Sequence, residues 1–271
     1  MSFLPKALVT AITLLLSATN VVAASLTAEQ LAGFVVQRPP NEGRTALMNF
    51  RMQNKSGSVR ERQAQLLSST SEGVERIAIY FTEPAMIEET AFLSINHVAM
   101  EVEDESWLYL PATGRVRRLP DANRGDPFMG TDMSFGDLQD NFTFGLDDYV
   151  FKLGAEEVVD GITFQVLEGT AKTPEIAKEM GYGHFRSRID PENFFPILTT
   201  YSDVDLAPLK EVEVLAIEQV GGAKMAAHFT FENLQTGHRT EIRYTEIKSV
   251  PDLDESMFDS NALSYGIPDV P

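Results

Sequence analysis

Apolar and polar residues alternate with a period of two along most of this chain. Met48, Phe50 and Met52 alternate with polar residues from Thr45 onward, and comparable runs follow after short turns. Successive side chains of a strand point to opposite faces of a sheet, so this pattern predicts strands with one buried face. Because short turns join neighbouring runs, we expect antiparallel pairing.

About ten strands are expected, from twelve strand-like segments. The strand-like segments that follow the first one are 59–66, 74–81, 107–110, 116–119, 149–153, 162–167, 185–189, 197–201, 212–219, 226–231 and 240–247. Thr236 and Gly237 predict a hairpin turn between the last two of them. No internal repeat, low-complexity tract or linker divides the chain, so we expect one domain.

Helical signals are confined to four places. Thr27 and Gln30 form a capping-box pair, and Pro39 and Pro40 end the helix that this pair opens. The other predicted helical segments are 134–138, 174–181 and 254–263. The last of these is capped by Asp254.

Three architectures can hide the edges of such a sheet. They are a closed barrel, a two-sheet sandwich, and one strongly curved sheet with helices that plug its concave face. Composition does not choose among them. Helices at the start and in the middle of the chain favour the curved sheet with plugs.

The first 24 residues have the character of a secretory signal peptide. Lys6 precedes a mostly apolar run over 7–18, and small residues follow at Val21 and Ala23. Twelve residues are too few to cross a bilayer as a helix, which takes about 20. We therefore expect cleavage after Ala23 or Ala24, a mature domain over 25–271 and export to a bacterial periplasm, which suits a chain without cysteine.

Charge and cysteine content exclude several classes of protein. The chain has 22 Lys and Arg against 40 Asp and Glu, a formal net charge of −18, and removal of Lys6 makes it −19. A surface this acidic argues against nucleic-acid binding, because it cannot neutralise phosphates over a broad face. The absence of cysteine excludes a disulfide framework, a thiol nucleophile and a lipid anchor on cysteine.

No catalytic or metal-binding motif stands out. The four histidines are His97, His184, His228 and His238, and no two have the spacing of a helical metal site. The segment from Gly130 to Gly136 lacks the Gly-x-Ser-x-Gly spacing of a serine nucleophile. Neighbouring acids such as Asp132 and Asp137 are common by chance among 40 carboxylates. We predict neither enzyme activity nor a metal or cofactor.

Two features rise above this background. The first is a basic cluster of Arg115, Arg117 and Arg118 on one predicted strand. In so acidic a chain it is a candidate for binding an anionic group or the acidic patch of a partner. The alternative is that these arginines pair with carboxylates on neighbouring strands.

The second feature is a glycine-rich segment with many large apolar side chains. It contains Phe128, Met129, Met133, Phe135 and Leu138. Flexible Met beside bulky Phe suits an adaptable apolar pocket. The alternative is an ordinary loop packed on the core.

The order of motifs resembles the outer-membrane lipoprotein-sorting (LolA-like) family, in particular a branch of exported proteins found alongside RND-type exporters. The resemblance covers the mature chain and rests on Phe81-Thr82-Glu83-Pro84, Thr90–Leu93, Trp107–Pro111, Arg115–Arg118, Phe128–Asp132, Asp137-Leu138, Tyr182, Asp190, Pro196, Tyr201, Phe258 and Leu263. It implies a mainly β fold, a single curved antiparallel sheet (an incomplete barrel) with helices that cover a hydrophobic cavity.

By the same resemblance the protein is a periplasmic, non-enzymatic carrier of a lipid, a lipidated protein or another hydrophobic cargo. The candidate cargo-binding residues are Trp107, Tyr109, Phe128, Met129, Met133, Phe135 and Leu138. The chain is longer than the sorting carriers themselves, so a hydrophobic molecule is a safer cargo than a lipoprotein. The alternative is an accessory or sensor subunit that docks on an RND-type exporter through its arginine cluster. A hydrolase function is disfavoured, because the chain contains no nucleophile motif.

Overall fold

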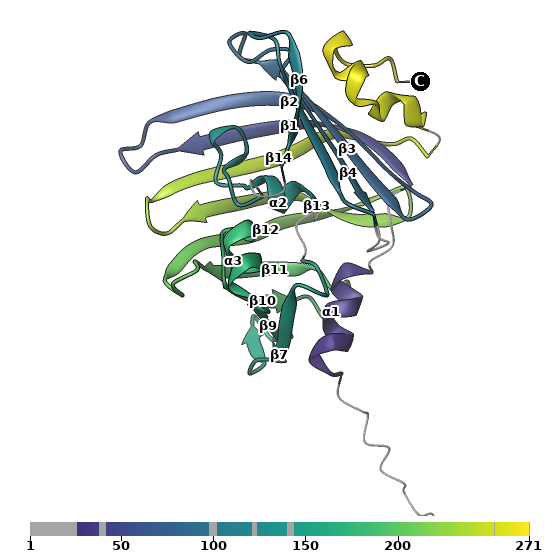
Figure 1. Cartoon of the computed structure of the whole chain (residues 1–271). Helices are drawn as coiled ribbons and strands as arrows, with labels where there is room; N and C mark the ends of the chain where they lie inside the picture. Colours follow the sequence, from purple (N-terminus) through teal and green to yellow (C-terminus); the bar gives the residue numbers. More distant parts are fainter. Residues whose placement is uncertain are drawn as a thin grey trace, which may run out of the picture.

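The strands form a single antiparallel sheet that curves around one side of the molecule (Figure 1). This computed structural model describes residues 26–37, 42–97, 102–120, 124–139, 144–251 and 253–270. The strands are β1 (Gly43–Gln53), β2 (Val59–Ser71), β3 (Val74–Glu83), β4 (Ala91–His97), β5 (Glu105–Leu110), β6 (Arg115–Leu119), β7 (Tyr149–Leu153), β8 (Glu157–Val159), β9 (Ile162–Ala171), β10 (His184–Ile189), β11 (Pro196–Ser202), β12 (Pro208–Val220), β13 (Ala223–Asn233) and β14 (His238–Ser249).

The order of pairing shows that the sheet is open. It runs β6-β5-β4-β3-β2-β1-β14-β13-β12-β11-β10-β9-β7, and β8 pairs with β9 off this path. The first and last strands of this order, β6 and β7, are not paired with each other in the described part of the chain. The predicted fold class, a single curved antiparallel sheet, is confirmed.

Short helices cover the sheet at the predicted places and at one other, over 128–130. They are the α-helices α1 (Ala28–Val36), α2 (Phe135–Gln139) and α3 (Pro174–Met180), and the 3₁₀ helices η2 (Phe128–Gly130), η3 (Glu255–Phe258) and η4 (Ser260–Tyr265). The capping box of Thr27 and Gln30 is formed, and Gly181 ends α3 in the left-handed conformation. The predicted terminal helix over 254–263 is instead two 3₁₀ helices, because Asp259 caps a second turn.

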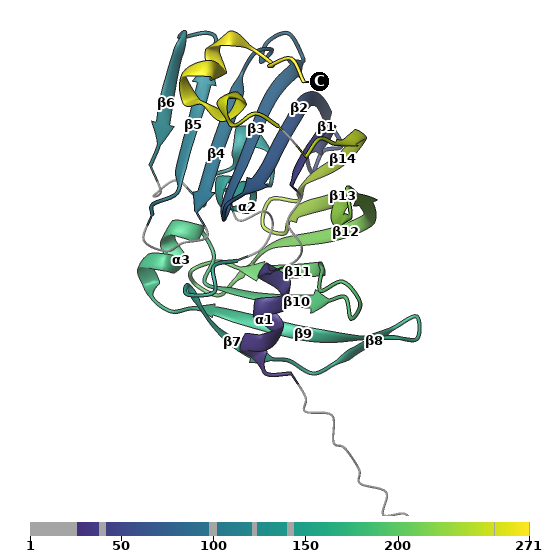
Figure 2. The same cartoon turned by 90° about the vertical axis from the view of Figure 1, so that its right-hand side faces the viewer.

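The two faces of the sheet are covered by different parts of the chain. Figure 2 shows the C-terminal 3₁₀ helices in front of the strands β3 to β6 and α2 behind them. The concave face carries two apolar clusters, one under α2 and one under α1, and Val212 packs against both. The convex face of β2 to β6 carries a third cluster, closed by Phe258 and Leu263. The middle of β3 and the start of β4 are therefore buried on both faces.

The strands β4 and β8 have no counterpart in the sequence prediction. In β4 the residues Ala91 to Ser94 are all buried, since both faces of this strand are covered, and period-two alternation is lost. Ser94 lies there with its hydroxyl bonded to Asn96 at 2.8 Å. The strand β8 has only three residues. Alternation detects a strand only when one of its faces meets water.

Two glycines give a matched prediction about packing. A Cβ on Gly169 would lie 2.3 Å from a ring carbon of Phe185, which stacks on Phe144, whereas a Cβ on Gly33 in α1 would touch nothing. We expect Gly169→Ala to lower the free energy of unfolding by about 1–3 kcal/mol. Gly33→Ala should raise it by about 0.5–1 kcal/mol, because alanine favours helix. Urea denaturation measures both, and equal effects would contradict this packing.

Two sequence predictions lie outside the described residues: the signal peptide over 1–24 and the helix stop at Pro39 and Pro40. Among the residues that the structure describes, no helix is both long enough and apolar enough to cross a membrane.

Candidate functional site

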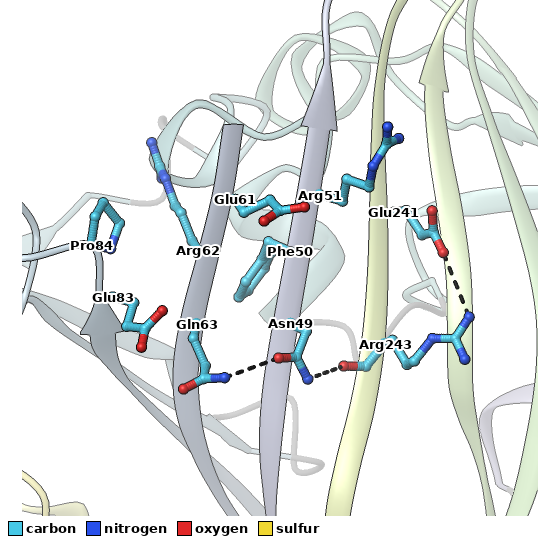
Figure 3. Close-up of a pocket in the computed structure, with 10 residues that line it drawn as sticks. All are labelled: Asn49, Phe50, Arg51, Glu61, Arg62, Gln63, Glu83, Pro84, Glu241 and Arg243. Carbon is cyan, nitrogen blue, oxygen red and sulfur yellow. Dashed lines mark hydrogen bonds and ion pairs between the residues drawn. The ribbon is translucent and has the colours of Figure 1, made fainter. Parts of the chain in front are cut away.

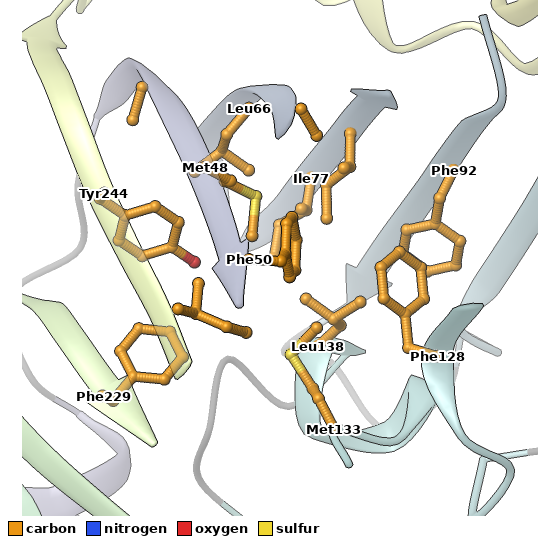
Figure 4. Close-up of a cluster of buried hydrophobic side chains, with 14 of the residues drawn as sticks. Met48, Phe50, Leu66, Ile77, Phe92, Phe128, Met133, Leu138, Phe229 and Tyr244 are labelled. Carbon is orange, nitrogen blue, oxygen red and sulfur yellow. The ribbon is translucent and has the colours of Figure 1, made fainter. Parts of the chain in front are cut away.

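A segment that is not part of the sheet covers the concave face of the strands β1 to β4, β13 and β14. We call residues 124–138 the plug segment; it contains η2 and the start of α2. Its side chains Phe128, Met133 and Leu138 are at most 2 % exposed. They pack against inward-facing residues of β1 to β4, β13 and β14, among them Phe50 and Phe229 (Figure 4). The apolar hollow expected from the sequence is thus occupied by the chain's own side chains.

Phe128 is the centre of the aromatic contacts that the plug segment makes. Its ring centroid lies 6.0 Å from that of Phe81 on β3 and 5.3 Å from that of Phe92 on β4. It also lies 5.4 Å from Phe135, which meets it edge to face. Edge-to-face and offset pairs add to the stabilisation that burial provides. Phe128 therefore supplies much of the attraction between the plug segment and the sheet.

A tight turn shapes the tip of the plug segment. Met129 and Gly130 both have positive φ angles, 51° and 76°, a conformation that costs energy for Met. The N–H of Phe128 donates to the carbonyl of Met133 at 2.7 Å, and the Thr131 hydroxyl donates to the carbonyl of Phe128 at 2.7 Å. The turn points the carbonyl of Met129 toward β2, where the guanidinium of Arg62 donates to it.

A second polar anchor joins the plug segment to β14. The Asp132 carboxylate accepts from His238 Nδ1 at 2.6 Å and from the Thr240 hydroxyl at 2.7 Å. The N–H of Asp132 donates back to that hydroxyl at 3.0 Å. Asp132 is only 6 % exposed at its side chain. These three hydrogen bonds tie the plug segment to β14.

The third anchor is a buried ion pair. Lys210 Nζ on β12 lies 2.6 and 2.9 Å from the two carboxylate oxygens of Asp137, and the two side chains are 7 % and 4 % exposed. The same carboxylate accepts from the N–H of Ser134 at 2.7 Å, and the Ser134 hydroxyl accepts from the N–H of Asp137 at 3.1 Å. Asp137 therefore both caps α2 and fixes it to the sheet.

Lys210 stands where the two apolar clusters of the concave face meet. Its ammonium lies 4.7 Å from the ring centroid of Tyr201, 5.7 Å from that of Tyr182 and 5.8 Å from that of Phe231. The two tyrosines belong to the cluster under α1, and Phe231 belongs to the cluster under the plug segment. Aromatic faces attract a cation, so this cage stabilises Lys210 beside its carboxylate.

Another positive group lies on the same face, near the far ends of β1 and β14. Arg44 Nη1 donates to the sulfur of Met225 at 3.5 Å. Burial lowers the pKa of Arg44 and raises the pKa of Tyr244 to about 12. The concave face therefore carries two buried positive groups, Arg44 near the ends of β1 and β14 and Lys210 between the two apolar clusters.

The structure separates the seven predicted cargo-binding residues into two groups. Phe128, Met129, Met133, Phe135 and Leu138 all lie in the plug segment on the concave face. Trp107 and Tyr109 lie on β5 and pack against the convex cluster under the C-terminal 3₁₀ helices. Their neighbour Leu108 points to the concave face instead. The seven residues therefore do not line one pocket, because alternation along β5 directs the two aromatic residues away from the plug.

The arginine cluster lies on β6, an end strand of the sheet. Arg115, Arg117 and Arg118 are all exposed. Arg118 approaches Glu105 and Glu103 at 3.7 and 3.9 Å. Local pairing therefore accounts for Arg118, as the alternative interpretation expected.

A polar hollow of about 380 Å³ lies over β14, β1, β2 and β3. Figure 3 shows that charged and amide side chains line it, with Gln63 bonded to Asn49 and Arg243 paired with Glu241. Three arginines and three glutamates line it, so the hollow has no net charge that would select a charged ligand. Within the described ranges, no three His, Asp or Glu side chains are placed to hold a metal ion.

Sequence reasoning missed the residues that anchor the plug segment. In the sequence Asp132 and Asp137 are only chance neighbours, and their partners His238 and Lys210 come from two distant strands, β14 and β12. One signal was available: Lys210 takes an inward position two residues before Val212 on an alternating strand. An inward lysine needs a buried partner, and a partner implies a covering segment.

The open sheet with its covered concave face is similar in fold to solved structures of the LolA superfamily. A LolA superfamily protein from Nitrosomonas europaea has the same fold, with a TM-score of 0.65 over 87 % of this chain and 98 % of that one at 19 % identity. A family model described as an uncharacterized protein matches residues 73–265, most of the chain. The chain belongs to this family, DUF1329.

Two solved structures are more similar in sequence. A DUF1329 family protein from Desulfovibrio piger is 25 % identical, with a TM-score of 0.78 over 87 % of this chain and 97 % of that one. A candidate outer membrane lipoprotein-sorting protein domain from Vibrio parahaemolyticus is 26 % identical, with a TM-score of 0.78 over 88 % and 98 % of the two chains. A search of the curated proteins finds no match.

Proposed function

We propose that the protein is a periplasmic, non-enzymatic carrier whose hydrophobic cargo takes the place of the plug segment on the concave face. The observation that carries this proposal is that a non-strand segment covers an apolar sheet face and is tied to it through separable polar contacts. Arg62, Lys210 and His238 make these contacts from the sheet. The similarity to a candidate lipoprotein-sorting domain supports the same function.

Burial energy makes such an exchange feasible. Each CH₂ group of an acyl chain gains about 0.8 kcal/mol on leaving water. A chain of about 14 carbons therefore gains on the order of 10 kcal/mol, enough to replace the contacts of Phe128 and its neighbours. The apolar side chains of the plug segment then cover the cargo site when cargo is absent; they are Phe128, Met129, Met133, Phe135 and Leu138.

Extraction of lipid from the purified protein tests this function. The full chain is exported to the periplasm of a bacterial host, purified without detergent, extracted with organic solvent and analysed by mass spectrometry. We expect a bound amphiphile, and saturable uptake of the fluorescent fatty acid cis-parinaric acid by delipidated protein. Absence of both a bound lipid and uptake would contradict the proposal.

A second candidate function rests on the position of the arginine cluster. The strand β6 is an open end of the sheet, and exposed Arg115 and Arg117 stand on it. Such an edge can pair with a segment of another chain, and arginine favours an acidic one. The partner proposed here is an RND-type membrane exporter, with the protein as its accessory or sensor subunit.

Alanine at Arg115, Arg117 and Arg118 together tests this docking. We expect the triple variant to lose co-purification with the exporter by at least about ten-fold, since two or three charge-assisted contacts are removed. Uptake of cis-parinaric acid should stay unchanged, because β6 lies apart from the plug segment's anchors. Co-purification equal to that of the wild type would contradict docking at this edge.

A further inference from the structure

We propose that the cargo is an amphiphile with one anionic head group, and that Lys210 binds this head group once the plug segment is displaced. This inference rests on the proposed carrier function and deepens it by naming the class of cargo. Its starting point is the ion pair of Lys210 with Asp137, which joins the sheet to the part that must leave.

Displacement of the plug segment removes the carboxylate but not the lysine. Asp137 and its capping partner Ser134 belong to the plug segment, whereas Lys210 belongs to β12 and is held among Tyr182, Tyr201 and Phe231. A buried charge that loses its partner is strongly disfavoured. A neutral cargo leaves the ammonium of Lys210 buried without a counter-charge, whereas an anionic head group pairs with it. The site therefore favours anionic cargo.

The geometry of the pair indicates which head groups fit. Both oxygens of Asp137 lie within hydrogen-bond distance of the one ammonium, at 2.6 and 2.9 Å. A fatty-acid carboxylate offers the same two oxygens, and a phosphate monoester offers a similar set. While the plug segment covers the sheet, the carboxylate of Asp137 occupies the position that the head group of the cargo takes after displacement.

The position of Lys210 also gives the tail a place to lie. Phe231 touches Lys210 and belongs to the cluster that the plug segment covers, together with Phe229 and Phe50. An amphiphile with its head at Lys210 can extend its tail over β13, β14 and β1, where Phe128 and Met133 now pack. One molecule thus replaces both the charge and the apolar contacts of the plug segment.

The test compares two probes that differ only in charge, cis-parinaric acid and its methyl ester. For the wild type we expect the acid to bind at least about ten-fold more tightly, the effect of one charge-assisted contact. In the double variant Lys210→Met with Asp137→Leu the preference should fall to within about two-fold. Lys55→Met, which removes an exposed lysine in a turn, should keep the preference of the wild type.

Each outcome has one meaning. Equal binding of acid and ester by the wild type overturns the proposal. A preference for the acid that survives in the double variant also overturns it, because another cation, such as Arg44, would then bind the head group. Binding of neither probe contradicts the carrier function itself. Lys210→Gln with Asp137→Asn, which keeps the hydrogen bond, replaces the double variant where circular dichroism shows that it does not fold. Competition by lysophosphatidate against palmitate distinguishes a phosphate from a carboxylate head group.

Discussion

We expect Phe128→Ala to increase the affinity of the protein for a neutral apolar probe by at least about one hundred-fold. Phe128 is fully buried and lies against Phe81, Phe92 and Phe135. Truncation of such a side chain costs about 3–5 kcal/mol, and here the cost falls on the closed form alone. The population with the plug segment displaced therefore rises, and cargo that competes with the plug binds more tightly. Fluorescence titration with methyl cis-parinarate measures the change.

Phe258→Ala is the matched control for this prediction. Phe258 is also buried, but it belongs to η3 and packs on the convex face of the same strands. Its truncation should lower the free energy of unfolding by about 3–5 kcal/mol. The affinity for the probe should not change, because the convex cluster holds no part of the plug segment. Equal affinities of the Phe128→Ala and wild-type proteins would contradict the exchange of plug for cargo.

The second large effect concerns the ion pair. Lys210→Met leaves the carboxylate of Asp137 buried without its cation, and we expect the free energy of unfolding to fall by about 3–5 kcal/mol. Adding Asp137→Leu removes the unpaired charge and should recover most of that loss, because a well-packed apolar pair is close to neutral in energy. Urea denaturation of the wild type, both single variants and the double variant gives the coupling energy.

An exposed pair provides the comparison. Arg118 and Glu105 approach at 3.7 Å with side chains 53 % and 39 % exposed, so Arg118→Met should change the free energy of unfolding by less than about 1 kcal/mol. A Lys210→Met variant that loses no more than Arg118→Met would contradict the buried pair as an anchor. A double variant that loses the sum of the two single losses would contradict it as well.

Local patterns predicted most elements of the fold. The alternation from Met48 to Met52 gave β1, and the capping residues Thr27 and Thr173 marked the starts of α1 and α3. These signals work because strand faces and helix caps are set by neighbouring residues. The strand β4 was missed because it is buried on both faces, a property that depends on segments far away in the sequence.

The candidate site was predicted only in part. The Phe and Met residues of 128–138 were recognised as unusual, and the structure brings all five onto one face. Trp107 and Tyr109 were assigned to the same pocket, since alternation shows which residues share a face but not which face is concave. The anchors Asp132 with His238 and Asp137 with Lys210 join residues more than 70 positions apart. Sequence spacing carries no information about such pairs.

The central claim is that the plug segment must leave the sheet before cargo binds. The chain has no cysteine, so an introduced pair forms the one disulfide that the protein can contain. Asp132→Cys with Thr240→Cys places the pair where the two side chains are in hydrogen-bond contact, at 2.7 Å, between the plug segment and β14. The control is Ser187→Cys with Thr199→Cys, whose hydroxyls are 2.8 Å apart on the paired strands β10 and β11.

Uptake of cis-parinaric acid by the oxidised and reduced forms of both proteins is the deciding measurement. We predict that oxidation abolishes uptake by the variant with cysteines at 132 and 240, that reduction restores it, and that the control takes up the probe in both states. Full uptake by the oxidised 132/240 variant would contradict the claim, because cargo would then bind while the plug segment still covers the concave face.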